Sequence, residues 1–412
     1  MNKDLVAPVS RRTVLKGAAL GGVATFIAAC TGARSSAAPS AAASASAAPS
    51  DAAASESPSG SSAPQTATGP LMFANWPAYI DLGDAEEYSA GASPTLEQFK
   101  TEYGVDVDYQ EKIGDNSSFV ETIKPALVGG LPTGWDLIVL TDWMASQIIT
   151  SGWAEKIDQA NVPNAVANLE DGLKNYPWDP TQDYHYPWQS GMTGLGFNAK
   201  TLSENGIAEP TKIADLWAIP ADKVTFLTEA RDTFGLGLAK LGIDPNPETV
   251  TDADLQAVAA DMQPLVDQGL RFTGNEYLQD FAQKKVWAAF VWSGDLASSG
   301  GPDDRFVFPA EGALIWTDNM LIPKGAANKY TAELMMNYVY DPKIAAQIAA
   351  YVYFVSPVKG AADEIKALDP EAATNPLLFP DAATAATFHA FQALSEEQEA
   401  VMNELFATLS GT

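Results

Sequence analysis

The chain beyond residue 70 alternates short apolar runs with amphipathic segments that carry helix-capping residues. Residues 71–76 and 135–140 are predicted to be buried strands, and Ser93 followed by Pro94 marks the start of a helix that Gly104 ends. Strands that alternate with helices over short connections form a mainly parallel sheet covered on both faces. The pattern predicts an α/β fold, in which ligands lie beyond the carboxyl ends of the strands.

Two apolar runs in the second half of the chain are each followed by a tryptophan and an aspartate. Trp292 and Trp316 end these runs, and Asp295 and Asp318 stand three and two residues further on. An indole face attracts a cation by about 0.5–2 kcal/mol, and a carboxylate adds a charge-assisted hydrogen bond of about 1.5–3 kcal/mol. The pattern indicates that the two strands bring a tryptophan and a carboxylate each to the same edge of the fold, where they form half of a binding site for an ammonium group. Two core tryptophans with solvated aspartates at strand ends would give the same pattern.

Further candidates for a ligand site lie at the carboxyl ends of other predicted strands. Trp76 ends the first apolar run, and Thr141 and Trp143 follow the run at 135–140. Glu229 and Asp232 are three residues apart, which puts both acids on one face of the first turn of a predicted helix. Acids at that position also favour the helix dipole, so their spacing leaves both interpretations open.

Charge and composition narrow the class of partner. The 412-residue chain has 52 acidic and 24 basic side chains and a formal charge of −28, which argues against binding to nucleic acid or an anionic membrane surface. This charge permits a cationic ligand, but the solubility of an exported protein explains it equally well. Cys30 is the single cysteine, and His185 and His389 are the two histidines. We therefore expect no internal disulfide, no metal site and no histidine-based triad.

The N-terminal region has the pattern of an export signal and a tether. Arg11 and Arg12 precede an apolar stretch too short to span a membrane permanently, and Cys30 follows the sequence IAA. This pattern resembles a twin-arginine signal that ends in a bacterial lipobox, where the cysteine receives a diacylglycerol; a buried helix with an incidental cysteine is the alternative. We expect residues 1–29 to be a signal peptide, Cys30 to be lipidated and residues 30–69 to be a disordered Ala/Ser/Pro tether. The protein would then be exported and anchored on the outer face of the cytoplasmic membrane.

The remainder of the chain resembles the polyamine-type (spermidine/putrescine) substrate-binding proteins of bacterial ABC importers. The resemblance implies a type II periplasmic-binding-protein fold, in which two hinge-connected lobes with central, mostly parallel sheets close around the ligand. Lobe 1 is expected at residues 70–187 and 318–358, and lobe 2 at residues 188–317 and 359–412. The segments that carry the resemblance, in the order of the family, are FANWPAYI (73–80), WDLIV (135–139), LTEARDTF (227–234), VWSGD (291–295) and EGALIWTDN (311–319).

The resemblance also implies roles for individual residues. Trp76, Tyr79, Trp292 and Trp316 would enclose the methylene chain of the ligand, and Asp318 would hold a primary amine. The other acids implied in the site differ by ligand: those that match acids on the far amine of longer ligands are Glu229 and Asp232, and the one typical of shorter-diamine members is Asp295.

Three positions depart from the family pattern. Thr141 stands where serine is usual, Trp143 where tyrosine is common, and Phe354 where some members have a ligand-contacting tyrosine. The bulk of Trp143 is expected to shorten the cleft, and Phe354 has no hydroxyl to offer. The length of the ligand therefore stays open.

The expected function is the capture of putrescine or spermidine by a monomer that needs no cofactor, and delivery to ABC permease subunits. A binding protein of the same fold for another solute, such as an amino-acid derivative, a sugar or a metal chelate, is an alternative. An anionic ligand would need a basic cleft, but few residues near the predicted strand ends are basic, and Arg231 is the obvious one. A secreted hydrolase is a remote alternative: Asp295 and Asp318 would suit a glycosidase, but no Gly-x-Ser-x-Gly motif or metal-ligand cluster marks an enzyme.

Overall fold

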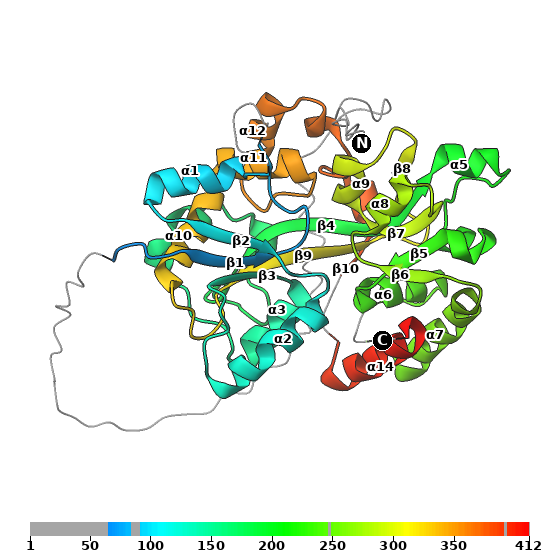
Figure 1. Ribbon diagram of the computed structural model, residues 1–412, viewed down its shortest axis with the longest axis horizontal. Coiled ribbons are helices and arrows are strands. Elements are labelled where there is room, and N and C mark those ends of the chain that lie inside the picture. Colours follow the sequence, from blue (N-terminus) through cyan, green and yellow to red (C-terminus); the bar gives the residue numbers. More distant parts are fainter. Residues whose placement is uncertain (1–64, 84–90, 246–248, 391–393, 412) are drawn as a thin grey trace, which may run out of the picture.

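The computed structural model describes residues 65–83, 91–245, 249–390 and 394–411, and in these residues ten strands form one sheet with helices on both faces (Figure 1). This architecture confirms the α/β class. The predicted signal peptide, Cys30 and most of the predicted tether lie outside the described residues. None of the described helices has the length and hydrophobicity that crossing a bilayer requires.

Two groups of parallel strands occupy the two ends of the sheet, whose order is β2-β1-β3-β9-β4-β7-β5-β6. At one end β1 pairs in parallel with β2 and β3, and at the other end β5 pairs in parallel with β6 and β7. Between them β9 and β4 are antiparallel to each other and to the adjacent groups, with β10 beside β9 and β8 beside β4. The strands are β1 (Leu71–Asn75), β2 (Val107–Glu111), β3 (Leu137–Thr141), β4 (His185–Asn198), β5 (Val224–Leu227), β6 (Arg271–Thr273), β7 (Ala288–Trp292), β8 (Asp304–Val307), β9 (Leu314–Leu321) and β10 (His389–Ala390).

Helix ends follow their capping residues. Helix α1 (Pro94–Tyr103) begins after Ser93, whose hydroxyl accepts a hydrogen bond from Leu96 N, and it ends at Gly104, which has a φ of 71°. Both ends agree with the prediction. The other α-helices are α2 (Asn116–Gly129), α3 (Asp142–Thr150), α4 (Pro163–Asn168), α5 (Ala199–Glu204), α6 (Ala230–Lys240), α7 (Asp252–Asp267), α8 (Tyr277–Ala282), α9 (Ser293–Ser299), α10 (Lys329–Val339), α11 (Pro342–Val352), α12 (Ala361–Leu368), α13 (Ala382–Ala385) and α14 (Glu396–Ser410).

Strands β4 and β9 run across the molecule and join its two ends (Figure 1). β4 has 14 residues, and β9 continues past Trp316 and Asp318 to Leu321. The sequence predicts a strand that ends with its apolar run at Trp316, and this predicted strand end is therefore wrong. β9 is hydrogen-bonded to β3 on one side and to β4 on the other, so its backbone stays in the sheet although its side chains become polar. Trp316 and Asp318 are two residues apart on this strand and hence share one face of the sheet.

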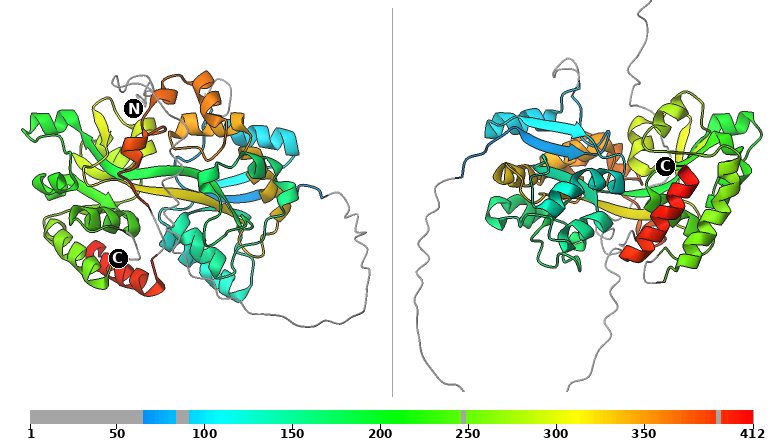
Figure 2. Two further views of the ribbon diagram at one scale, coloured as in Figure 1. Left: turned by 180° about the vertical axis from the view of Figure 1, so that it is seen from behind. Right: turned by 60° about the horizontal axis from the view of Figure 1, so that its bottom comes forward.

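The helices form two layers. Helices α1, α11 and α12 lie with α8 and α9 on one side of the sheet, and α2, α3, α6, α7 and α14 lie on the other (Figures 1 and 2). Between the layers, the rings of Phe226 and Phe290 stack with centroids 3.9 Å apart. The C-terminal segment contributes to both layers: Ile365 of α12 is buried against Ala346 and Ala349 of α11, whereas α14 packs beside α7.

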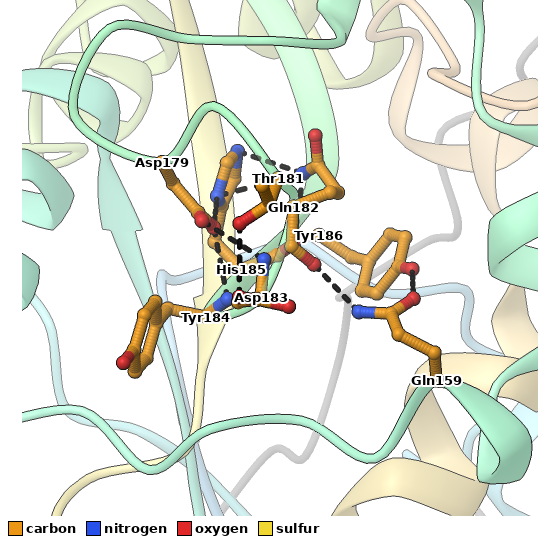
Figure 3. A network of polar contacts seen from close by, with 8 residues as sticks. All are labelled: Gln159, Asp179, Thr181, Gln182, Asp183, Tyr184, His185 and Tyr186. Atoms are coloured by element: carbon orange, nitrogen blue, oxygen red, sulfur yellow. Dashed lines mark hydrogen bonds and ion pairs between the residues drawn. The ribbon is translucent and has the colours of Figure 1, made fainter. Parts of the chain in front are cut away.

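A buried polar network holds the beginning of β4 (Figure 3). Asp179 Oδ2 accepts hydrogen bonds from His185 Nδ1 at 2.7 Å and from Tyr184 N at 2.8 Å, and Asp179 Oδ1 accepts one from Asp183 N at 2.8 Å. Burial lowers the pKa of His185, so the imidazole is neutral at pH 7 and donates a single hydrogen to the carboxylate. The network therefore fixes the point at which the chain enters the central strand.

Asp179→Ala is expected to lower the free energy of unfolding by about 3 kcal/mol, because it removes the acceptor of a buried imidazole and of two backbone N–H groups. Urea unfolding followed by circular dichroism measures the change. Asp171→Ala is the control: its exposed carboxylate pairs with Lys174 and Lys359, and surface pairs contribute about 1 kcal/mol or less. Equal losses in the two variants would contradict this role of the network.

Candidate functional site

A pocket with about 400 Å³ of empty space, part of it open to solvent, is lined by residues from both parallel groups of strands and from β9. Ten of the eleven predicted ligand-binding residues line it, and Trp143 is the exception. None of the described lining residues is lysine, arginine or histidine. Most of the lining follows the carboxyl end of a strand, as expected for this class of sheet. The lining consists of Trp76, Pro77, Tyr79, Thr141, Glu229, Asp232, Asn275, Trp292, Asp295, Trp316, Asp318 and Phe354.

Five aromatic side chains form the walls of the pocket. The indoles of Trp76 and Trp292 meet edge to face, with ring centroids 6.0 Å apart and an interplanar angle of 73°. Phe354 packs against Tyr79 and Trp316, with centroid distances of 5.1 and 5.5 Å. The indole N–H groups of Trp76 and Trp316 donate to protein oxygens at 3.1 and 3.0 Å. These hydrogen bonds fix the rings and leave their apolar surfaces for the ligand.

Two glycines allow this aromatic wall to lie close to the backbone. A Cβ atom at Gly191 would lie 2.6 Å from the ring of Trp316 and 2.7 Å from that of Phe354, and one at Gly294 would lie 2.5 Å from Phe354. Such distances are far below van der Waals contact, so any side chain at either position displaces the rings. Gly191 belongs to β4 and Gly294 to the first turn of α9.

Asp318 and Thr141 face each other on the paired strands β9 and β3. Thr141 Oγ1 donates to Asp318 Oδ1 at 2.8 Å, so the threonine that departs from the family pattern keeps a hydroxyl at this acid. The hydroxyl of Tyr79 is buried beside Asp318 and has no hydrogen-bond partner of good geometry among the described residues. Burial and the neighbouring Asp318 raise its pKa, and its closeness to the carboxyl opposes the raised pKa of Asp318.

Asp295 lies at the other strand group, in the first turn of α9. Its Oδ2 accepts hydrogen bonds from Asn275 Nδ2 at 2.7 Å and from Tyr277 Oη at 2.5 Å. Tyr277 Oη in turn accepts a hydrogen bond from Trp292 N at 3.2 Å. The carboxylate is thus oriented by two side chains that belong to one short segment after β6.

Glu229 and Asp232 stand at the start of α6. Glu229 is the N-cap residue, not part of the first turn as predicted, and its side chain does not cap the helix. Instead, Glu229 Oε2 accepts hydrogen bonds from N and Nδ2 of Asn116, at 3.1 and 3.0 Å. Asp232 accepts one from the Thr193 hydroxyl and one from Trp292 Nε1 at 3.4 Å. Both acids line the pocket, which favours the ligand-binding interpretation over the helix-dipole one.

The four carboxyl groups line one pocket and are buried away from water. Burial raises the pKa of Asp295 to about 6, of Asp318 and Asp232 to about 7, and of Glu229 to about 8. The charge of Asp232 adds to the effect at Asp318 and Glu229, and hydrogen bonds from the neighbours oppose it. A positive charge in the pocket would stabilise the ionised acids. The electrostatics therefore suit a cationic ligand.

Two residues considered from the sequence lie outside the lining. Trp143 is 1% exposed and belongs to the hydrophobic core under α3. The expectation that its bulk shortens the cleft is therefore wrong. Arg231 is buried as well, and burial lowers its pKa to about 10, so it stays positively charged. Arg231 does not line the pocket, but its charge acts on Glu399, Asp142, Glu229 and Asp232.

Three polar residues of the site were not anticipated from the sequence. Asn275 lines the pocket, Tyr277 orients Asp295, and Asn116 is bonded to Glu229. Asn275 follows β6, which has only three residues and no apolar run that identifies a strand. Asn116 opens α2, shortly after β2 ends. Its place at the carboxyl end of a strand was the one signal that could have drawn attention to it.

Comparison with known proteins gives the family. Residues 95–380 match the model of the bacterial extracellular solute-binding proteins. The chain is 28% identical over 327 residues to the spermidine/putrescine-binding periplasmic protein of Escherichia coli, covering 79% of this chain and 87% of that protein. It is 27% identical over 331 residues to the putrescine-binding periplasmic protein of the same organism, covering 76% and 83%.

A solved structure supports the fold. The spermidine/putrescine ABC transporter substrate-binding protein of Streptococcus pneumoniae has a TM-score of 0.63 at 22% identity, over 83% of this chain and 98% of that chain. This likeness confirms the predicted periplasmic-binding-protein fold. The family model spans well over half of the chain, and the pocket occupies the edge of the sheet where ligands of such folds lie. The chain therefore belongs to the bacterial extracellular solute-binding proteins.

Proposed function

We propose that this protein captures a short aliphatic polyamine, putrescine or spermidine, and delivers it to the permease subunits of an ABC importer. The observation that carries the proposal is the pocket itself: four buried carboxyl groups, walls of aromatic rings, and no basic side chain among the described lining residues. A protonated polyamine is an apolar chain with fixed positive charges, so it needs aromatic contacts along its length and acids at its ends.

The free acceptor positions support an elongated cation. Thr141 donates to Oδ1 of Asp318, and Asn275 and Tyr277 donate to Oδ2 of Asp295. The remaining carboxylate oxygens, with the Tyr79 hydroxyl beside Asp318, are the candidate acceptors for the ammonium groups. The aromatic rings of Trp292 and Trp316 line the space with them. We therefore assign Asp318 and Asp295 to the two ends of a diamine. The names of the two Escherichia coli relatives, which refer to spermidine and putrescine, agree with this ligand class.

We further propose how the chain is organised around the pocket. The two parallel strand groups would form the centres of two lobes, residues 70–187 with 318–358 and residues 188–317 with 359–412, which close on the ligand as a monomer. Residues 1–29 would be removed as a signal, and lipidated Cys30 with the Ala/Ser/Pro tether would hold the protein at the outer face of the cytoplasmic membrane. The protein binds and releases its ligand without chemical turnover.

Asp318→Asn is expected to weaken putrescine binding at least about tenfold, which corresponds to about 1.4 kcal/mol, because it keeps the shape and removes the charge. Isothermal titration calorimetry with putrescine, spermidine and uncharged 1,4-butanediol measures the effect. The parent should bind both amines and not the diol. Asp171→Asn, at a distant exposed carboxylate, should bind like the parent. An unchanged affinity in Asp318→Asn would remove this residue from the site, and a parent that binds no amine would refute the function.

Amine affinity is expected to rise with pH between 5 and 8. Burial raises the pKa of Asp295 to about 6, of Asp232 and Asp318 to about 7, and of Glu229 to about 8. A bound ammonium favours the ionised acids and so lowers these pKa values, which means that binding releases protons and is opposed by acid. Calorimetry in buffers of different ionisation enthalpy counts the protons. Affinity that is constant over this range, with no proton release, would contradict the electrostatics derived for the pocket.

Cys30→Ala is expected to move the protein from the membrane fraction to the soluble fraction of cells, because the anchor depends on the single thiol of the chain. Fractionation followed by immunoblotting measures the distribution. Ser40→Ala, in the predicted tether, is the matched control and should stay with the membranes. A Cys30→Ala protein that remains membrane-bound would overturn the lipid-anchor proposal.

A further inference from the structure

Asn116 is an uncharged, fully buried residue. It forms hydrogen bonds with pocket residues that belong to both strand groups, Thr141 and Glu229. Its Nδ2 donates to Thr141 Oγ1 at 2.9 Å and to Glu229 Oε2 at 3.0 Å, and its backbone N donates to the same Glu229 oxygen at 3.1 Å. Its Oδ1 accepts a hydrogen bond from Thr141 N at 3.1 Å. Both amide hydrogens and the amide oxygen are engaged, so the orientation of this amide is fixed.

The fixed amide determines which way the Thr141 hydroxyl points. A hydroxyl carries one hydrogen. Because Thr141 Oγ1 accepts a hydrogen bond from Asn116 and lies 2.8 Å from Asp318 Oδ1, its own hydrogen is directed at Asp318. Asp318 therefore receives a donor through Thr141, and Glu229 receives two donors directly. Hydrogen bonds donated to a carboxylate favour its ionised form.

The contact also joins the two halves of the pocket. Asn116 opens α2, which follows β2 in one parallel strand group, whereas Glu229 follows β5 in the other. The hydrogen bonds from Asn116 to Glu229 exist only while the two groups are close together. The approach of the two groups and the supply of donors to Glu229 are thus coupled in one side chain.

We propose that Asn116 is a positioning residue of the ligand site, which holds Glu229 directly and Asp318 through Thr141 as carboxylates ready to receive the ammonium groups of the ligand. This inference rests on the proposed polyamine-binding function and adds to it a residue that does not line the pocket. Asn116 acts through its neighbours and stays behind the surface that the ligand touches.

The surroundings of the two acids oppose the effect of Asn116, which makes its contribution measurable. Burial and the charges of Asp232 and Asp115 raise the pKa of Glu229, and burial and the charge of Asp232 raise that of Asp318. Without the donors from Asn116 to Glu229, and without Asn116 to direct the Thr141 hydroxyl at Asp318, both acids should ionise at higher pH. The titratable groups that face the two acids are Asp115, Asp142, Arg231, Asp232 and Tyr79.

Asn116→Ala in the full chain tests the proposal by calorimetric titration with putrescine at several pH values. The variant is expected to bind about tenfold more weakly than the parent at pH 6.5, since a shift of about one pKa unit changes the ionised fraction about tenfold. The difference should narrow to about threefold or less at pH 9, where the acids ionise without help. A purely structural defect would not recover as the pH rises. An equal affinity at pH 6.5, or a loss of the same size at every pH, would overturn the proposal.

Two further variants keep the test decisive. Asn116→Asp preserves the volume and the helix cap at Asp115, but its side chain has no N–H to donate, and it is expected to bind at least as weakly as the alanine variant at pH 6.5. Asn198→Ala is the matched control, because Asn198 also lies at the start of a helix, as the N-cap of α5, and donates to a carboxylate, Asp304, outside the pocket. Its affinity and pH profile should match the parent. A parent that binds no amine refutes the function, whereas a binding parent with unaffected Asn116 variants refutes only this inference.

Discussion

Carboxyl groups buried around a space with no basic side chain in its described lining are the constraint that gives this pocket its chemistry. Taking a charged group out of water costs several kcal/mol unless it is paired, and here four acids share one space with no basic residue among the described lining. The protein moderates that cost with hydrogen bonds from threonine, tyrosine, asparagine and tryptophan. These hydrogen bonds do not remove the cost of burial, as the raised pKa values of all four acids indicate. A cationic ligand completes the arrangement.

The sheet brings these groups together from distant parts of the sequence. β9 and β4 lie between the two parallel groups, with β9 paired to β3 and β4 paired to β7, so strand ends separated by more than a hundred residues open on one pocket. Asp318 sits within β9 opposite Thr141 of β3, while Trp292 ends β7 on the far side of β4. Gly191 lets the rings of Trp316 and Phe354 lie directly on β4. The same strands that carry the fold therefore set the spacing between the aromatic walls and the acids.

Much of the site was predictable because its residues follow recognisable strands. Trp76 and Trp292 stand at the ends of strong apolar runs, and the carboxyl ends of such strands meet at one edge. Trp143 also follows an apolar run, but position in the sequence does not tell which face of the next helix enters the core. The length of β9 was underestimated because its apolar run stops at Ile315. Pairing with strands on both sides keeps the polar residues after it in the sheet. The links from Asn116 to Glu229 depend on tertiary contacts that no local pattern encodes.

A crystal structure of the protein grown with putrescine tests the central claim most directly, because it locates both nitrogen atoms of the ligand. One ammonium nitrogen should lie about 3 Å from a carboxylate oxygen of Asp318 and the other about 3 Å from one of Asp295, with the methylene chain between the indoles of Trp292 and Trp316. Electron density for the amine outside the aromatic walls, or a pocket that holds an anion in its presence, would contradict the interpretation of these buried acids as a receptor for an elongated cation.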